Sequence, residues 1–448
     1  MATCGQATLN ASGTHNPLPR PASNYGSRPE PSYAGTVNSN LTTSAVPPIR
    51  RKTALGLVMA SHAGQHMYSG LLPLTYPAIL LAFHLNYATL GLAVGVVGII
   101  GGLTQATAGF VGRRVAARWV LGYQNLAVGA CSIIGALAPT YAIFVVAQGA
   151  SSLGTSQQHP VGSSVAARVF PDRRGLALSL TSVGGSLGSL LIPIPAAFLI
   201  SAWGWRPTLL LMSVPLFVIA VILFLTFPPL PPERRVARMP GARRFRLPQV
   251  ARSQILNRRL AVLGIVAGTV AAGGRGLGTL NTFIPLYLRN QLHLPELTVG
   301  AVFNLILLGA VVGPLLAGPL SDRFGRLPVL WTAYGLSAAA VFVFGESEHF
   351  PLAVVALLAL AVGLVAYAEN PLLQAAVSDS VTSEAQSTIF GIYFALAFGV
   401  GSLWTIGLGQ AIQHLGFAAA FTIMAASYLA AGAILIPCYS SVRKSSRG

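Results

Sequence analysis

The chain has 448 residues, of which 53% are hydrophobic and only 8% are charged, and its mean hydropathy is +0.66. Soluble globular proteins carry about 25% charged residues, so this composition excludes a chain that is surrounded by water. Apolar segments of roughly 20 residues recur along most of the sequence, and each is long enough to span a bilayer. The composition therefore predicts a polytopic helical membrane protein.

The formal net charge is +18, which in a soluble protein would point to nucleic-acid binding. All but three of the 28 Lys and Arg fall in the N-terminus, the C-terminus or alternate loops between the predicted spans, and the exceptions are Arg206, Arg289 and Arg275. Basic residues concentrate on the cytoplasmic side of membrane proteins. We therefore expect a multi-pass protein of the cell membrane with both termini in the cytoplasm and no nucleic-acid partner.

Residues 1–53 are rich in Pro, Ser, Asn and Gly without apolar periodicity, so we expect a disordered cytoplasmic tail. Two sets of six apolar segments follow, which predicts an all-α fold of twelve transmembrane helices in two pseudo-symmetric bundles, 54–227 and 260–437. A proline-broken, arginine-rich linker, 228–259, joins the bundles, and residues 438–448 form a short cytoplasmic tail. The predicted spans are 54–82, 88–111, 116–138, 140–168, 174–201, 205–227, 260–289, 297–317, 327–345, 350–378, 386–411 and 415–437.

The two halves repeat weakly but in the same order. Pro73 in "SGLLPLTYP" corresponds to Pro285 in "NTFIPLYLR", and "QHP" at 158–160 corresponds to "ENP" at 369–371. Parallel repeats of this kind place a substrate site near the bilayer midplane, between the halves. The three cysteines have no metal-binding spacing and no obvious disulfide partner, and no motif requires a cofactor.

The segment "GPLSDRFGR" resembles the loop signature that the major facilitator superfamily carries between its eighth and ninth spans. Its signature residues are Gly318, Asp322, Arg323, Gly325 and Arg326. The matching first-half loop keeps Gly109, Arg114 and Arg118 but has Arg113 where the family has an acid. The resemblance covers about residues 54–437 and implies a secondary transporter that works by alternating access.

A narrower resemblance is to the fosmidomycin-resistance-like efflux branch of that superfamily. The first span, "HAGQHMYSGLLP", follows the pattern of the branch except that His66 replaces an acid. Gln158-His159-Pro160 stands where the branch has Phe-His-Pro, and Arg275 precedes a matching "FIPLY" run at 283–287. This resemblance implies proton-coupled efflux.

Glu369 is the one acidic residue that lies deep within a predicted span. A carboxylate at the bilayer centre costs about 2.5–3.5 kcal/mol on insertion scales, and desolvation favours its protonated form. It either binds a coupling proton, beside Asn370, or holds helices together. Arg275, flanked by glycines, either faces the substrate, where a guanidinium suits a carboxylate or phosphate, or pairs internally with Glu369.

His62 and His66 are four residues apart and share one helix face, and with Gln65 and Tyr68 they form a polar stripe on the first span. Histidine titrates near physiological pH, which suits proton coupling; hydrogen bonding to a neighbouring helix is the alternative. Two histidines at this spacing can bind zinc, but "HAGQH" lacks the glutamate of the zinc-protease motif and no third ligand stands out. No metal is therefore expected.

Proline in the middle of a span removes a backbone hydrogen bond and loosens the helix. Pro160 and Pro371 stand at equivalent depth in the fourth and tenth predicted spans, each beside polar side chains. We therefore expect a hinge in both helices. Gln158 and His159, which precede Pro160, become candidate contacts for a proton or a substrate.

The loop signature predicts a gate. Charge-assisted hydrogen bonds from Asp322 to nearby arginines can latch one access state and re-form in the other. Gly318 and Gly325 are expected to allow close approach and a tight turn. Because Arg113 replaces the first-half acid, Asp379 or Glu384 is the expected partner of Arg113 or Arg114.

These features predict a monomeric, proton-coupled exporter of a small anionic or amphiphilic compound, with no ATP-binding loop and no enzyme activity. Three alternatives stay open. The first is a proton symporter or facilitator for uptake of an organic acid or similar nutrient. The second is an intramembrane metalloprotease built on His62, His66 and His159, and the third is a transport-dead nutrient sensor.

Overall fold

Helices joined by short turns make up the part of the chain that the computed structural model describes, and this part contains no strand. The described residues are 48–112, 114–230, 259–381, 389, 392–393 and 395–438. The first half comprises α1 (Pro48–Ala82), α2 (Tyr87–Gly112), α3 (Ala117–Leu137), α4 (Tyr141–Thr155), α5 (Gln158–Val169), η1 (Pro171–Arg173), α6 (Arg174–Leu191), α7 (Pro193–Trp203) and α8 (Trp205–Thr226). The second half comprises α10 (Arg259–Ala271), η3 (Gly276–Leu280), α11 (Asn281–Leu286), η4 (Tyr287–Gln291), α12 (Glu296–Phe324), α13 (Arg326–Gly345), η5 (Ser347–His349), α14 (Leu352–Ala366), α15 (Glu369–Asp379), η6 (Ala395–Val400) and α17 (Ser402–Ile434).

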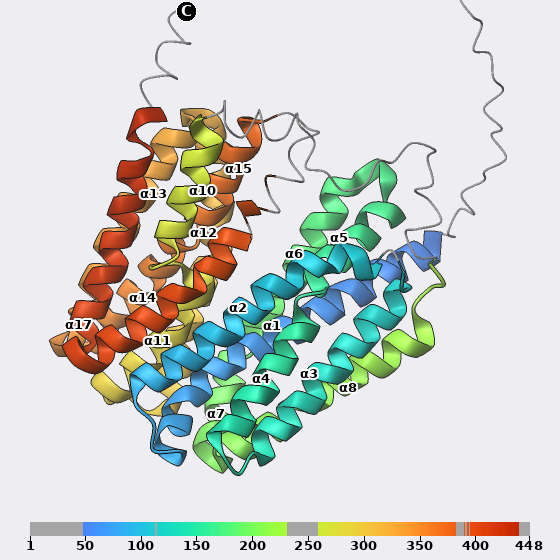
Figure 1. The fold of residues 1–448 in the computed structure, drawn as a ribbon, viewed down its shortest axis with the longest axis horizontal. Helices are drawn as coiled ribbons and strands as arrows, with labels where there is room; N and C mark the ends of the chain where they lie inside the picture. The colour runs from blue at the N-terminus through green and yellow to red at the C-terminus, as the bar shows by residue number, and fades with distance from the viewer. Residues whose placement is uncertain are drawn as a thin grey trace, which may run out of the picture. The chain divides into compact units, whose positions relative to one another are not determined.

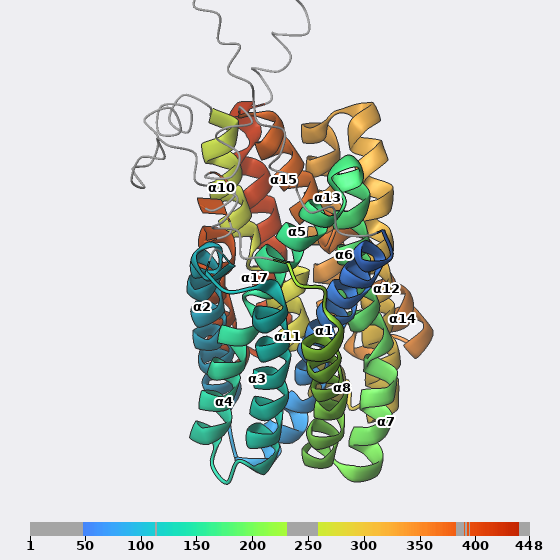
Figure 2. The same ribbon diagram turned by 90° about the vertical axis from the view of Figure 1, so that its right-hand side faces the viewer.

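Helices α1 to α8 form one bundle, drawn in blue and green, and α10 to α17 form a second, drawn in yellow to red (Figure 1). In the first bundle α3 packs along α8 and α1 along α6, and Figure 2 shows α1, α3 and α8 running alongside one another. In the second bundle α12 packs along α14 and α13 along α17. Among the described residues, eight helical segments are long and apolar enough to cross a membrane by length and composition. Helices suit hydrocarbon because all their backbone hydrogen bonds lie within the segment.

Matching turns confirm that the two halves repeat. His84 and His293, 209 positions apart, both have φ of 52°, and each lies between the first two spans of its half. Gly204 and Gly416, 212 positions apart, have φ of 82° and 84° and lie between the last two spans of each half. This left-handed backbone suits glycine and is uncommon for other residues. The repeated sequence landmarks therefore correspond to a repeated chain path.

The fourth and tenth predicted spans are each broken into two helices, and each break lies a few residues before the proline at which a hinge was expected. Helix α4 ends at Thr155 and α5 begins at Gln158, while α14 ends at Ala366 and α15 begins at Glu369. Pro160 and Pro371 are thus the third residue of a new helix. A proline fits there because the first-turn N–H groups have no partner within the helix.

Other boundaries also differ from those expected. Residues 48–53, predicted as tail, are helical because α1 begins at Pro48. The seventh span is not one helix: α10 ends at Ala271, and the π-helical segments η3 and η4 flank α11. The last two spans meet at Gly416, inside the α17 range, rather than at 412–414. Residues 1–47, 231–258 and 439–448 lie outside the described part of the chain.

The halves contact each other at the helix ends next to His84, Gly204, His293 and Gly416. The Tyr87 backbone N–H donates to Gln413 Oε1 over 3.1 Å, and Asn290 Nδ2 donates to Tyr87 Oη over 3.1 Å. Nearby, α2 crosses α17 so closely that a Cβ on Gly91 would lie 2.8 Å from the Thr405 carbonyl oxygen and 2.9 Å from Gly409 Cα. Glycine is therefore required at this crossing.

Candidate functional site

The breaks in α4–α5 and α14–α15 place two polar side chains at equivalent positions inside the protein. Gln158 is the first residue of α5 and Glu369 the first residue of α15, and their exposed fractions are 1% and 0%. The first backbone hydrogen bonds of the new helices also correspond, from Val161 N to Gln157 O and from Leu372 N to Ala368 O. At the same position of the repeat, the first half thus has a side-chain amide and the second half a carboxyl group.

Gln158 belongs to a hydrogen-bond network that ties α1, α3 and α5 together. Its Oε1 accepts from Ser61 Oγ over 2.7 Å and from Gln124 Nε2, and its Nε2 donates to the Val58 carbonyl over 3.3 Å. Asn125 Nδ2 donates to Ser61 Oγ over 2.7 Å. Gln158 therefore acts as an interhelical contact. Sequence reasoning missed Ser61, Gln124 and Asn125, although two adjacent amides within an apolar span were a usable signal.

The remaining polar stripe of α1 also makes contacts between helices. Gln65 Nε2 donates to Asn125 Oδ1 over 3.4 Å, and the buried Tyr68 hydroxyl donates to Gln148 Oε1 over 2.9 Å. Polar side chains hold membrane helices together in this way because lipid offers no competing partner. Gln65 and Tyr68 thus have a structural role in this conformation.

Three histidine rings from α1 and α5 meet in the first half. The ring centroids of His62 and His66 lie 4.7 Å apart, those of His62 and His159 4.9 Å, and those of His66 and His159 6.0 Å. His62 Nδ1 is 2.7 Å from the Thr181 carbonyl oxygen, and His66 Nδ1 is 3.0 Å from Ser189 Oγ. His62 is buried, His66 half-buried and His159 exposed. Only the metalloprotease alternative grouped these three residues, since His159 is far from the other two along the chain.

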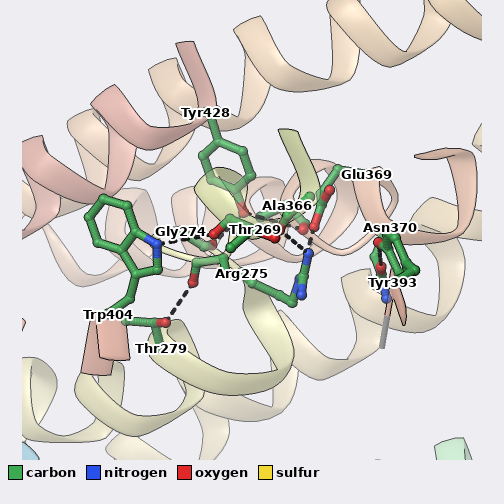
Figure 3. A network of polar contacts seen from close by, with 12 residues as sticks. Thr269, Gly274, Arg275, Thr279, Ala366, Glu369, Asn370, Tyr393, Trp404 and Tyr428 are labelled. Atoms are coloured by element: carbon green, nitrogen blue, oxygen red, sulfur yellow. Dashed lines mark hydrogen bonds and ion pairs between the residues drawn. The ribbon is translucent and has the colours of Figure 1, made fainter. Parts of the chain in front are cut away.

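Arg275 and Glu369 form a buried ion pair in the second half (Figure 3). Arg275 lies in the turn between α10 and η3, and its Nε is 3.2 Å from Glu369 Oε1. Its Nη2 donates to the Gly268 carbonyl over 2.7 Å. The side chains are 5% and 0% exposed. The internal pairing left open by the sequence is thus present.

One oxygen of the Glu369 carboxyl, Oε2, is buried and has no hydrogen-bond partner among the described residues. Three aromatic side chains belong to the same polar network: the Tyr428 hydroxyl donates to the Gly274 carbonyl, the Tyr393 hydroxyl to Asn370 Oδ1, and Trp404 Nε1 to the Thr269 carbonyl over 3.1 Å (Figure 3). These three aromatic residues were not predicted from the sequence.

The loop signature forms contacts within the second half. Arg326 Nη1 lies 2.6 Å from Asp322 Oδ1, and its Nε lies 3.0 Å from Asp379 Oδ2. Asp379 was one expected partner of Arg113 or Arg114. It is instead paired with Arg326, the first residue of α13. Arg113 and Glu384 lie outside the described residues.

The glycines and the remaining arginines of the signature behave differently from one another. Gly325 has φ of 92° and makes the turn between α12 and α13, as expected. Gly318 allows no close approach, because a Cβ there would meet nothing within 4 Å. Arg323 lies over the Phe324 ring and Arg118 over the Trp119 ring, with guanidinium-to-centroid distances of 5.3 and 4.9 Å. Arg114 is exposed.

Two repeated bundles of membrane-spanning helices, with buried polar groups in each, define the class of secondary transporters. The chain belongs to the Major Facilitator Superfamily, whose family model matches residues 58–405 and 266–448. Its twelve-span, all-α fold and its function as a multi-pass membrane transporter follow from that membership.

Relatives and a solved structure agree with this assignment. The chain is 24% identical over 383 residues to the fosmidomycin resistance protein of Escherichia coli K12, covering 83% of this chain and 89% of the relative. It is 24% identical over 367 residues to the cis,cis-muconate transport protein of Acinetobacter baylyi, covering 78% and 82%. The crystal structure of the nucleoside transporter NupG superposes with a TM-score of 0.70 at 14% identity, covering 85% of this chain and 98% of that one, and shows the fold.

Proposed function

We propose that this transporter couples substrate movement to protons at Glu369, and that it exports a small amphiphilic or anionic compound. Transport proceeds by rocking of residues 54–227 against 260–437, in the cell membrane, with both termini in the cytoplasm. The observation that carries the proposal is the buried Arg275–Glu369 pair, in which one carboxyl oxygen has no hydrogen-bond partner among the described residues.

Protonation of Glu369 would weaken the pair. An uncompensated buried charge is costly, so a change in the charge of one partner changes what the other can bind. Exchange of substrate for protons requires that the two compete for one group. A hydrogen-bond donor on an amphiphilic substrate can bind the open Glu369 Oε2, and a proton on the same carboxyl would displace it. This is export by antiport, and the similarity to a fosmidomycin resistance protein supports it.

The same pair supports a second candidate function for anionic substrates. An anion that replaces Glu369 beside Arg275 binds best when Glu369 is protonated, so the anion and the proton would move together. This is symport, the uptake alternative, and the similarity to a cis,cis-muconate transport protein favours it. The two candidates therefore differ in the sign of the proton movement.

Purified protein in liposomes that contain a pH-sensitive dye tests both candidates, with fosmidomycin and cis,cis-muconate as the substrates offered outside. Antiport moves protons out as substrate enters and makes the lumen alkaline, whereas symport makes it acidic. Glu369→Gln should abolish either signal. Glu296→Gln is the matched control, because Glu296 pairs with Arg289 at 2.8 Å and is 34% exposed. Substrate-driven proton movement that is undiminished in Glu369→Gln would overturn coupling at this residue.

A further inference from the structure

We propose that His62, His66 and His159 form a binding site for one divalent first-row transition-metal ion such as Zn²⁺. One nitrogen from each of the three imidazoles lies within 4.8 Å of the other two. The site is built by α1 and α5 in the first half, apart from the ion pair of the second half. It does not depend on the proposed transport mechanism.

The spacing is close to that of a metal site. Zinc binds imidazole nitrogen at about 2.0–2.1 Å, so a tetrahedral ion separates its ligand nitrogens by about 3.4 Å. The widest pair of the three nitrogens must therefore close by about 1.4 Å at most, which rotation of side chains can supply. His159 is exposed and His66 half-buried.

Hydrogen bonds to the protein hold one nitrogen of each of two rings. The Thr181 carbonyl can only accept, so His62 Nδ1 carries the proton and donates to it over 2.7 Å. His62 Nε2 is then left with its lone pair, and it is buried without a hydrogen-bond partner among the described residues. Ser189 Oγ holds His66 Nδ1 at 3.0 Å. Metal-binding histidines show this arrangement, with one nitrogen bound to protein and the other turned to the ion.

The ligand set selects the kind of ion. Imidazole suits Zn²⁺, Cu²⁺, Ni²⁺ and Fe²⁺, whereas Mg²⁺ and Ca²⁺ prefer oxygen ligands. Three histidines leave the fourth position of a tetrahedral ion open, and a water molecule or an anion can fill it on the exposed side, next to His159.

A glycine on α6 keeps space for the cluster. A Cβ on Gly185 would lie 2.8 Å from His62 Cε1 and 2.9 Å from His62 Nε2. Contacts this short force the imidazole to move. Gly185→Ala should therefore weaken metal binding without removing a ligand, an effect that a nonspecific site would not show.

Full-length protein purified on a tag without histidines tests the proposal. We expect one equivalent of Co²⁺ to give the absorption of a tetrahedral site, Zn²⁺ to displace it, and Mg²⁺ to have no effect. His62→Ala, His66→Ala and His159→Ala should each weaken Zn²⁺ binding by more than about tenfold, since loss of a supporting group alone costs 10–100-fold. His414→Ala, a change at an exposed histidine on α17, should leave binding unchanged.

A second measurement needs no variant. Zn²⁺ should protect His62, His66 and His159 of the wild-type protein from diethyl pyrocarbonate, read by mass spectrometry, while His414 stays reactive. Wild-type protein that binds no Zn²⁺, affinity unchanged in the three alanine variants, or equal modification of all four histidines with and without the ion would each overturn the proposal.

Discussion

Arg275 and Glu369 neutralise each other's buried charge, so the loss of either side chain should destabilise the protein. Removing one partner of a buried pair typically costs about 3–5 kcal/mol, whereas replacing both by apolar residues is often neutral. We expect Arg275→Met to lower the melting temperature of the detergent-solubilised protein, and Arg275→Met with Glu369→Leu to restore most of the loss. In the half-buried Arg289–Glu296 pair, Arg289→Met should cost at most about 1 kcal/mol. Equal melting temperatures for the single and double variants would contradict this.

The sequence predicted those features of the candidate site that depend on spacing within one helix. Spacing along α1 put His62 and His66 on one face, and the scarcity of acids within spans identified Glu369. The sequence contained no distance between helices, so it could not place His159 against His62 or Ser61 against Gln158. Helical spacing identifies only two adjacent histidines, and the third member of the cluster, His159, lies on α5.

At the scale of helices, the sequence predicted the number and order of spans better than their interruptions. The apolar runs and repeated landmarks were enough for the family fold, which the family match confirms. The prolines indicate an interruption in each of these spans but not its position, because the chain starts a new helix two residues before each proline. Proline limits where a helix can continue without fixing where the preceding helix ends.

The crossing of α2 and α17 gives a prediction at the same scale. A Cβ on Gly409 would lie 2.8 Å from the Tyr87 carbonyl oxygen and 2.9 Å from Gly91 Cα, so Gly409→Ala should push the two helices apart. Overpacking typically costs about 1–3 kcal/mol, which shifts the balance between access states away from this contact. Electron-spin distances between labels on Ala82→Cys and His414→Cys should lengthen. Gly407→Ala, on the same helix with nothing within 4 Å, is the matched control; the same lengthening there would contradict the argument.

The two halves follow the same chain path but carry different polar groups. At the equivalent helix starts, the first half has the neutral Gln158, held by hydrogen bonds from α1 and α3, and the second has the charged Glu369 beside Arg275. The first half also carries the three histidines. Rocking of one half against the other would therefore move a charged group past an uncharged, hydrogen-bonded one. Coupling is expected to reside in the second half, with the first half offering the separate metal site.

The orientation of the whole molecule gives the last prediction. Basic residues lie mainly in the tails and alternate loops, which predicts that the Gly325 turn is cytoplasmic and the Gly416 turn is outside. In intact cells a membrane-impermeant maleimide should label His414→Cys, whereas Arg323→Cys, which is also exposed, should react only after the membrane is permeabilised. Replacing the native cysteines in both variants removes background labelling. The reverse labelling pattern would contradict the charge rule for this chain, and the direction of transport would then have to be reassigned, because the proton gradient would act from the other side.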